Sequence, residues 1–309
     1  MSSNRQLKTK IHAVGNIKQI TRAMEMVAAT KMRKAQEVAL RARPYAKYAL
    51  SLLRSLLLLE GGEELRAQSH FFKEENRKNP CLVVVTSDRG LCGGFNSQVL
   101  RTALKFRKEY PDSSIVTIGK KGKEFFERRG ILVERSFSDF SEIVTLADVD
   151  PVVQFLIGEY AEHRHDTIAF CSTQFVSALV QKVALYRVLP ITLDELGKTI
   201  QAIIPKSGKY SDMQNKEDTL ESVVALLEPG ASSIFENLVE ALVRVEILHL
   251  ILESNASEHS SRMLAMKNAT DNAEDLQEEL QLLLNKARQG AITQELSEIA
   301  SAKEALVNE

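Results

Sequence analysis

The C-terminal quarter of the chain carries a hydrophobic repeat that is typical of a coiled-coil helix. Pro229 and Gly230 end the preceding segment, and Ser232 or Ser233 can cap a new helix. Apolar or small residues then recur at alternating steps of four and three, the spacing of a coiled-coil seam. They are Leu238, Leu242, Val245, His249, Leu252, Ala256, His259, Met263, Met266, Thr270 and Ala273, followed by Leu276, Leu280, Leu283 and Ala287. The pattern predicts one helix of roughly 75 residues, about 110 Å long, part of which must project from any globular domain.

The N-terminal segment has a stripe of the same kind. Its members are Leu7, Ile11, Val14, Ile17, Thr21, Met24, Ala28, Met32, Ala35 and Val38. Pro44 interrupts the helix without ending it, because apolar residues at the same spacing continue as far as Leu59. Gly61 and Gly62 form the natural stop.

The two stripes are expected to pack against each other as an antiparallel two-helix coiled coil. Residues 1–54 hold twelve basic and two acidic side chains, net +10, whereas residues 231–309 hold fourteen acidic and six basic, net −8. Exposed ion pairs contribute only a few tenths of a kcal/mol each, so the apolar seam must supply most of the stability. This pairing is also expected to bring Met24 into the neighbourhood of Arg288.

Residues 55–230 read as alternating strands and helices, and they contain twelve of the fourteen glycines and six of the seven prolines. The predicted strands are residues 81–86, 114–118, 131–137 and 167–171, with 176–188 as a further strand or hairpin arm and 223–227 closing the sheet. The predicted helices are residues 95–110, 120–129 and 151–163. This order indicates a mostly parallel sheet covered by helices on both faces.

The pattern as a whole predicts an α/β protein with three parts. Residues 1–60 form an N-terminal coiled-coil helix, residues 61–230 an inserted Rossmann-like, mostly parallel α/β domain, and residues 231–309 a C-terminal coiled-coil helix.

Composition narrows the function classes. Lys and Arg total 40 against 41 Asp and Glu, which argues against a general nucleic-acid binder. The three cysteines form no CxxC pair and the six histidines show no ligand spacing, so neither a disulfide scaffold nor a metal site is expected. The longest apolar runs, residues 56–59 and 247–252, are too short to span a membrane. The basic, amphipathic start resembles a transit peptide, but its pattern runs on for more than 50 residues, so we interpret it as part of the helix.

A glycine-rich turn, residues 87–96 (SDRGLCGGFN), follows the first strand and opens a helix. Phosphates bind at turns of this type, through free amides and the helix dipole. The turn fits neither GxGxxG nor the P-loop pattern, so a structural role is favoured and a nucleotide site is the alternative. Cys92 could act as a nucleophile only with a base, and no histidine lies near it in the sequence.

The histidines add no clear chemistry. His163 and His165 suggest a metal or a base, but a solvated helix end is the favoured interpretation. His249 and His259 are expected to be packed within the seam. We therefore expect no catalytic, cofactor-binding or metal-binding residues, and a rigid rod on an α/β base that transmits force or assembles partners. Two alternatives are an α/β enzyme with a coiled-coil dimerisation arm and a filament or adaptor rod.

Three long stretches carry a resemblance to a known family. They are ITRAMEMVAATKMRKAQ (residues 20–36), SEHSSRMLAMKNATDNA (257–273) and LNKARQGAITQELSEI (284–299), and the turn SDRGLCGGFN accompanies them. These stretches resemble the γ subunits of F-type ATP synthases. The resemblance covers almost the whole chain in the same order, including the inserted middle.

The resemblance implies a non-catalytic rotor shaft that couples transmembrane proton flow to rotary synthesis of ATP from ADP and phosphate, and to the reverse hydrolysis. It also implies that the shaft regulates the ATPase activity. The implied partners are three α and three β subunits around the shaft, the ε and δ subunits and the membrane c-ring, with no cofactor, no nucleic acid and no substrate of its own. The implied location is the cytoplasmic face of the bacterial inner membrane, where the protein is peripheral. A chain that starts at the shaft helix favours a bacterial source, and the absence of the chloroplast cysteine pair argues against thiol regulation.

The resemblance also implies where the shaft touches the stator. The contact residues map onto Lys286, Arg288, Gln289 and Thr293, with Glu295 beside them, and onto the N-terminal helix from Met24 to Arg33. The end of the chain, residues 299–307, resembles the tip that turns in an apolar sleeve, and residues 206–213 are assigned to the foot surface.

Overall fold

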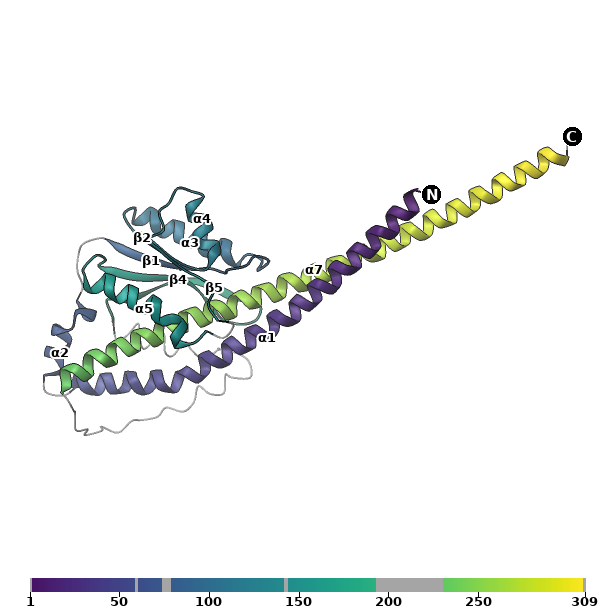
Figure 1. Cartoon of the computed structure of the whole chain (residues 1–309). Helices are drawn as coiled ribbons and strands as arrows, with labels where there is room; N and C mark the ends of the chain where they lie inside the picture. The colour runs from purple at the N-terminus through teal and green to yellow at the C-terminus, as the bar shows by residue number, and fades with distance from the viewer. Residues whose placement is uncertain (1, 59–60, 74–78, 142–143, 193–229, 308–309) are drawn as a thin grey trace. The chain divides into compact units, whose positions relative to one another are not determined.

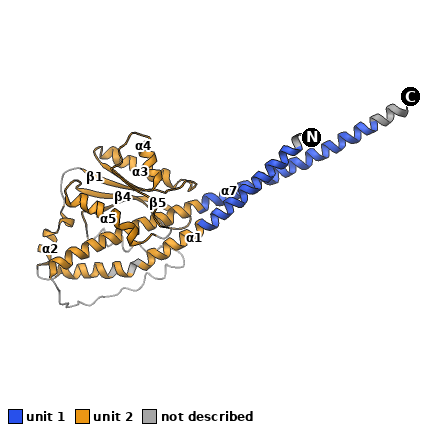
Figure 2. Cartoon of the chain, viewed as in Figure 1, with its two compact units in different colours: residues 1–27, 263–309 blue, residues 28–262 orange. Residues whose placement is uncertain are grey.

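The computed structural model describes residues 2–58, 61–73, 79–141, 144–192 and 230–307. The chain divides into two compact units, which are coloured separately in Figure 2. Unit 1 consists of Met1–Val27 and Met263–Glu309, and unit 2 is Ala28–Arg262. The three-part division by sequence, with boundaries at residues 60 and 230, stays a prediction.

Two long helices contribute to both units. Helix α1 spans Ser2–Leu58, and Pro44 lies inside it without ending it. Helix α7 spans Ala231–Val307 and has 77 residues, close to the length predicted from the repeat. The prediction of one long helix at each end of the chain is confirmed.

In unit 1 the two helices run antiparallel. The Thr270 hydroxyl donates to the Thr21 hydroxyl over 2.8 Å, and both side chains are buried. Lys18 Nζ lies 2.7 Å from Glu274 Oε1. Going back from Thr21 to Lys18 on α1 corresponds to going forward from Thr270 to Glu274 on α7, so the two helices run in opposite directions. This confirms the predicted antiparallel packing.

The seam of α7 differs from the predicted stripe beyond Ala273. Leu276 and Leu283 are about half exposed, whereas Gln277 and Leu284 are partly buried. The prediction was wrong at these two leucines because it followed the apolar residues. The strict alternation of four and three residues selects the next position along the chain in each case.

The seam of α1 shows the same shift at one position. Ile17 is about half exposed, whereas Lys18 is partly buried. A lysine can occupy such a place because its aliphatic stem packs on apolar surface while the amine reaches a partner. Here the partner is Glu274 of the facing helix.

Unit 2 is built on a five-stranded sheet in the order β3-β2-β1-β4-β5, of which Figure 1 labels β2, β1, β4 and β5. The pairs β1–β2, β1–β4 and β2–β3 are parallel, and β4–β5 is antiparallel. The strands are β1 (Pro80–Val85), β2 (Ser114–Ile118), β3 (Arg135–Phe137), β4 (Thr167–Phe175) and β5 (Gln181–Leu189). The mostly parallel sheet is confirmed, and the uncertain run 176–188 is the second arm of a β-hairpin. The proposed closing strand at 223–227 lies outside the described residues.

The shorter helices connect these strands. They are α2 (Gly62–Gln68), the 3₁₀ turn η1 (His70–Phe72), α3 (Phe95–Glu109), α4 (Lys120–Glu127) and α5 (Leu146–Ala161). Helix α5 begins before Pro151, where the sequence had placed its start. The Asp148 side chain accepts the Thr145 backbone N–H over 2.8 Å, so a capping interaction rather than the proline sets this helix end. The predicted strand 131–137 is confined to Arg135–Phe137.

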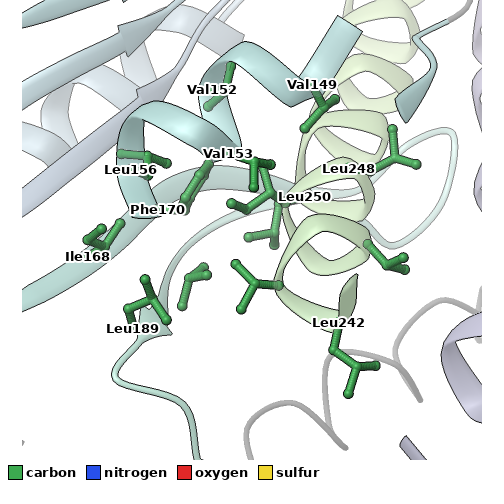
Figure 3. Packing of buried hydrophobic residues seen from close by; sticks show 14 of the residues in the cluster. Val149, Val152, Val153, Leu156, Ile168, Phe170, Leu189, Leu242, Leu248 and Leu250 are labelled. Carbon is green, nitrogen blue, oxygen red and sulfur yellow. The ribbon is translucent and has the colours of Figure 1, made fainter. Parts of the chain in front are cut away.

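Helices cover both faces of the sheet in unit 2 (Figure 1). One face packs on α3 and α4 through a cluster that includes Leu82, Val99 and Phe126. The other face packs on α5 and on the unit 2 parts of α1 and α7. In Figure 3 the side chains of Val153 from α5, Phe170 from β4 and Leu250 from α7 point into this one core.

Gly119 shows how closely β1 and β2 meet at their carboxyl ends. Its φ is +96°, and a Cβ there would lie 2.1 Å from the Thr86 carbonyl oxygen. The Thr86 hydroxyl in turn accepts the backbone N–H of Gly122 over 2.8 Å. Only glycine fits at position 119, and the contact fixes the loop that leads into α4.

The core predicts the cost of a truncation in α7. Leu242 is 1% exposed, so Leu242→Ala is expected to lower the free energy of unfolding by about 2–5 kcal/mol through lost burial and a residual cavity. Leu132, which is 86% exposed, is the control, and Leu132→Ala should change it by about 0.5 kcal/mol or less. Urea unfolding followed by circular dichroism measures both. Equal effects of the two variants would contradict the packing described for α7.

Candidate functional site

The glycine-rich turn, residues 87–96, is closed by hydrogen bonds within itself. Asn96 accepts the Ser87 backbone N–H over 3.0 Å and donates to the Ser87 hydroxyl over 2.7 Å. The Ser87 hydroxyl donates to the Arg89 carbonyl over 2.7 Å. Leu91 and Gly93 have positive φ values of 64° and 56°, which lets the chain reverse in this short space.

Helix α7 holds the outside of the same turn. Arg262 Nη2 donates to the carbonyls of Arg89 and Gly90 over 3.1 and 3.2 Å. The Ser261 hydroxyl donates to the Cys92 carbonyl over 2.7 Å. Three backbone carbonyls of the turn are thus used to dock it on α7, which supports the structural interpretation. Ser261 and Arg262 were missed as partners of the turn, although both lie in the stretch SEHSSRM that the sequence singled out.

Charge is concentrated where α7 meets this turn. Arg262 Nη1 lies 2.7 Å from Glu258 Oε1 and 3.1 Å from His259 Nδ1. Burial raises the pKa of Glu258, although the charge of Arg262 opposes the shift. Burial, together with the positive charges of Arg262 and Lys31, lowers the pKa of His259 to about 4. His259 is therefore a neutral, packed seam residue near neutral pH, as the sequence suggested.

The proposed stator contacts on α7 lie on two different faces of the helix. The side chains of Lys286, Gln289 and Thr293 are exposed and follow one another at steps of three and four, so they share one face. Arg288 and Glu295 are also exposed and are seven residues apart, which places them together on another face. The Thr293 hydroxyl donates to the Gln289 carbonyl over 3.0 Å.

The proposed contacts on α1 are separated by the unit boundary. Met24 is partly buried in unit 1, whereas Arg33 is exposed in unit 2. The expected closeness of Met24 and Arg288 is wrong. Since Thr21 faces Thr270, Met24 is level with residue 267 or nearby, and Arg288 is about 21 residues further along α7. At 1.5 Å per residue, roughly 30 Å of helix separate them.

Two groups of expected residues are only partly covered by the structure. The foot surface at residues 206–213 lies outside the described residues. Of the tip, Ile299 is exposed on α7, and the side chains beyond residue 300 are also outside the description.

His165 is not part of a solvated helix end, and this prediction was wrong. Its side chain is buried, and its Nε2 lies 3.2 Å from Glu134 Oε2. His163, two residues earlier, is exposed and has a φ of 57°, which turns the chain so that His165 points inward. His249 is packed as expected, 3.4 Å from Glu253 and beside a cavity of about 20 Å³.

No helix in the described part of the chain is long and apolar enough to cross a membrane. A family model described as ATP synthase matches residues 3–306. The ATP synthase gamma chain of Pelotomaculum thermopropionicum is 35% identical over 308 residues, which cover 99% of this chain and all of that protein. The chain belongs to the ATP synthase gamma chain family.

Further relatives agree with this assignment. The ATP synthase gamma chain of Chloroflexus aurantiacus is 36% identical over 312 residues, covering all of both chains. A chain in the Euglena gracilis mitochondrial ATP synthase rotor superposes with a TM-score of 0.61 at 19% identity, with 94% of this chain and 99% of that chain covered. At this identity the structural likeness shows the shared fold. The family and the fold class expected from the sequence are confirmed.

The register of the gamma chain's helix pair predicts a specific cross-link. In the double variant Thr21→Cys/Thr270→Cys the sulfurs replace two hydroxyls that lie 2.8 Å apart, so mild oxidation should join them. The native cysteines Cys81, Cys92 and Cys171 are buried. Proteolytic cleavage of the chain between α1 and α7, followed by non-reducing electrophoresis, detects the disulfide because the two fragments then stay joined. The control Met24→Cys/Arg288→Cys should remain uncrosslinked, and the opposite result for the two pairs would refute the register.

His259 predicts a loss of stability in acid. The folded chain holds the pKa of His259 at about 4, below its ordinary value of 6.5, so the unfolded chain takes up the proton first as pH falls. The stability that His259 contributes is therefore present above pH 6.5 and lost toward pH 4, by about 3 kcal/mol at most. Urea unfolding across this window should show a weaker pH dependence for His259→Gln than for the native chain. Glu258 acts in the opposite sense but is present in both proteins; parallel curves would contradict the prediction.

Proposed function

We propose that this gamma chain is the central shaft of an F-type ATP synthase and is itself non-catalytic. In this role it couples proton flow through the membrane to rotary synthesis of ATP from ADP and phosphate, and to the reverse hydrolysis, whose rate it helps to regulate. The shaft consists of residues 1–60 and 231–309, and residues 61–230 form the foot. The observation that carries the proposal is the antiparallel helix pair of unit 1, made from both ends of the chain.

The helix pair has the properties that a shaft needs. The buried Thr21–Thr270 bond and the Lys18–Glu274 pair, one helical turn apart, fix the register of the two helices in unit 1. A pair with a fixed register resists sliding, so a rotation applied at one end is carried to the other. A flexible linker would absorb the same rotation as a change of its own conformation.

The free energy of ATP synthesis requires an element that carries work from the membrane to the catalytic sites. One charge that crosses 100 mV supplies only about 2.3 kcal/mol, so several crossings must be summed before one ATP can form. A stiff element can store and deliver that work between distant sites.

The contacts with the stator are proposed to lie on the exposed face of Lys286, Gln289 and Thr293, and on the face of Arg288 and Glu295. Met24 and Arg33 on α1 complete the set. Polar side chains on two faces of one helix would meet an acidic loop of a β subunit in some orientations of the shaft and leave it in others. The affinity of the shaft for each β subunit then depends on the angle of rotation. This dependence couples the orientation of the shaft to the state of the catalytic sites.

The proposed partners are three α and three β subunits, the ε and δ subunits and the c-ring. The relatives' names support the ATP synthase assignment, and the Euglena structure that resembles this chain is described as a rotor. We place the protein at the cytoplasmic face of a bacterial inner membrane, as a peripheral subunit.

A nucleotide-binding enzyme is the less favoured function. It would need the turn at residues 87–96 to be open to phosphate. The carbonyls of Arg89, Gly90 and Cys92 accept hydrogen bonds from Arg262 and Ser261, which supports a docking role, and residues 87–96 match neither the GxGxxG nor the P-loop pattern. ATP binding by the isolated chain, measured by calorimetry, would be needed to support an enzyme.

The stator contact is tested by Arg288→Ala/Gln289→Ala in the assembled complex. The double variant removes an exposed guanidinium and an amide from two neighbouring faces of α7, so coupling is expected to weaken. We expect at least a fivefold loss in both ATP synthesis and ATP hydrolysis, the lower end of typical coupling energies. Membrane vesicles energised by a proton gradient measure synthesis, and an ATP-regenerating assay measures hydrolysis.

The control is Glu278→Gln/Glu279→Gln, which changes an exposed pair on the same helix outside the proposed set. This variant should keep native rates, and both variants should retain the native subunit ratio in the purified complex. Native rates in Arg288→Ala/Gln289→Ala with intact assembly would count against the contact. An equal loss of activity in both variants would mean that any change of exposed side chains on α7 impairs the complex, and it would also count against a specific contact.

A further inference from the structure

Three potential metal ligands lie close together at the amino ends of strands β1, β3 and β4 in unit 2. Cys81 lies in β1, Glu134 immediately precedes β3, and His165 precedes β4. One ligand atom from each residue lies within 4.8 Å of the other two. Because these residues are 31 to 84 positions apart in the chain, their spacing in the sequence gave no sign of a metal site.

The backbone holds the cluster in place before any ligand arrives. The Asn79 side chain donates to the Arg164 carbonyl over 2.6 Å, and the Asn79 backbone N–H donates to Asp166 over 3.2 Å. His165 is thus fixed on both sides. The Glu134 backbone N–H donates to the Ile115 carbonyl over 2.8 Å, which ties the second ligand to β2.

The surroundings of Cys81 favour a cation. Cys81 is fully buried, and the carboxylates of Glu134 and Glu159 lie near enough to raise the pKa of its thiol further, after the larger effect of burial. Within the described residues, one oxygen of Glu159 and Nδ1 of His165 are buried without a hydrogen-bond partner. A positive ion at this place would offset the negative charges of the two carboxylates and of the thiolate that Cys81 becomes when it binds the ion.

We propose that Cys81, Glu134 and His165 bind a divalent ion of the zinc class, with a solvent molecule as the fourth ligand. Thiolate, imidazole and carboxylate together select zinc rather than calcium or magnesium, which prefer oxygen alone. Binding forms a metal–sulfur bond and releases the thiol proton to water. The thiolate and the carboxylate then balance the two charges of the ion.

The geometry needs little adjustment. Zinc bonds of about 2.0 to 2.3 Å in a tetrahedron place ligand atoms about 3.3 to 3.6 Å from one another. His165 Nε2 and Glu134 Oε2 are already 3.2 Å apart, and one ligand atom from each of the three residues lies within 4.8 Å of the other two. The Glu134 side chain is 30% exposed, so it provides both the path for the ion and the place for solvent. The ion would join the ends of β1 and β4 to the segment that leads into β3.

The site is tested with Co²⁺ as a spectroscopic probe on the purified, untagged full-length chain under a phosphine reductant. The native chain should show a thiolate-to-cobalt charge-transfer band, bind one Co²⁺ per chain, and lose the band when Zn²⁺ is added. In Cys81→Ser the band should disappear. In Glu134→Gln the band should remain while the affinity falls about tenfold or more.

Cys171→Ser is the matched control, because Cys171 is also a buried thiol, on the neighbouring strand β4, and lies outside the cluster. It should bind Co²⁺ as the native chain does. The absence of a charge-transfer band in the native chain would overturn the proposal, as would native affinity in Glu134→Gln. Should Cys81→Ser fail to fold by circular dichroism, Glu134→Gln decides, since its side chain is partly exposed. The outcome is independent of the shaft function.

Discussion

The fold of unit 2 depends on the burial of α7 on nearly all of its sides. Between Leu242 and Ser260 this helix presents almost no solvent-facing side chain, because α1 packs on one side and the sheet with α5 on the other. A helix buried all round must also satisfy its polar residues internally. Ser257 donates to the Thr173 carbonyl over 3.2 Å, and Ser260 donates to the Ala178 carbonyl over 2.7 Å. The serines therefore attach α7 to the β4–β5 hairpin, as Ser261 and Arg262 attach it to the turn after β1.

The long helices could be predicted because their seams repeat, but the positions within a seam could not always be. Residues 276–284 contain several leucines close together, so a seam chosen by the most apolar residues differs from a seam chosen by heptad spacing. The structure follows the spacing, with Gln277 in the seam facing Gly15. A Cβ at Gly15 would lie 3.5 Å from Gln277 Nε2, an ordinary contact distance, so position 15 of α1 and the Gln277 side chain face each other across the seam. Packing against the partner helix decides such positions, and the choice of apolar residues alone does not reveal it.

The candidate sites were predictable only where they are local. The turn after β1 was found from its glycines, but its partners lie about 170 residues away on α7. Cys81, Glu134 and His165 share no local pattern, and only the parallel order of the strands brings them together. His165 was misread because the sequence shows a charged helix end, whereas the left-handed turn at His163 directs the next residues inward. The stator contacts came from the family resemblance, since exposed polar residues on a helix carry no signature of their own.

The pairing of chain ends has a consequence for biosynthesis. Thr21 and its partner Thr270 are separated by 249 residues, so their contact has one of the largest loop-closure distances that this chain allows. During translation α1 leaves the ribosome first, with its apolar face uncovered, and the sequence that covers it is among the last to be made. Until then Ala28, Met32 and Ala35 have no second helix to pack against. The nascent polypeptide must therefore be shielded from association with its neighbours, by a chaperone or by rapid completion of synthesis.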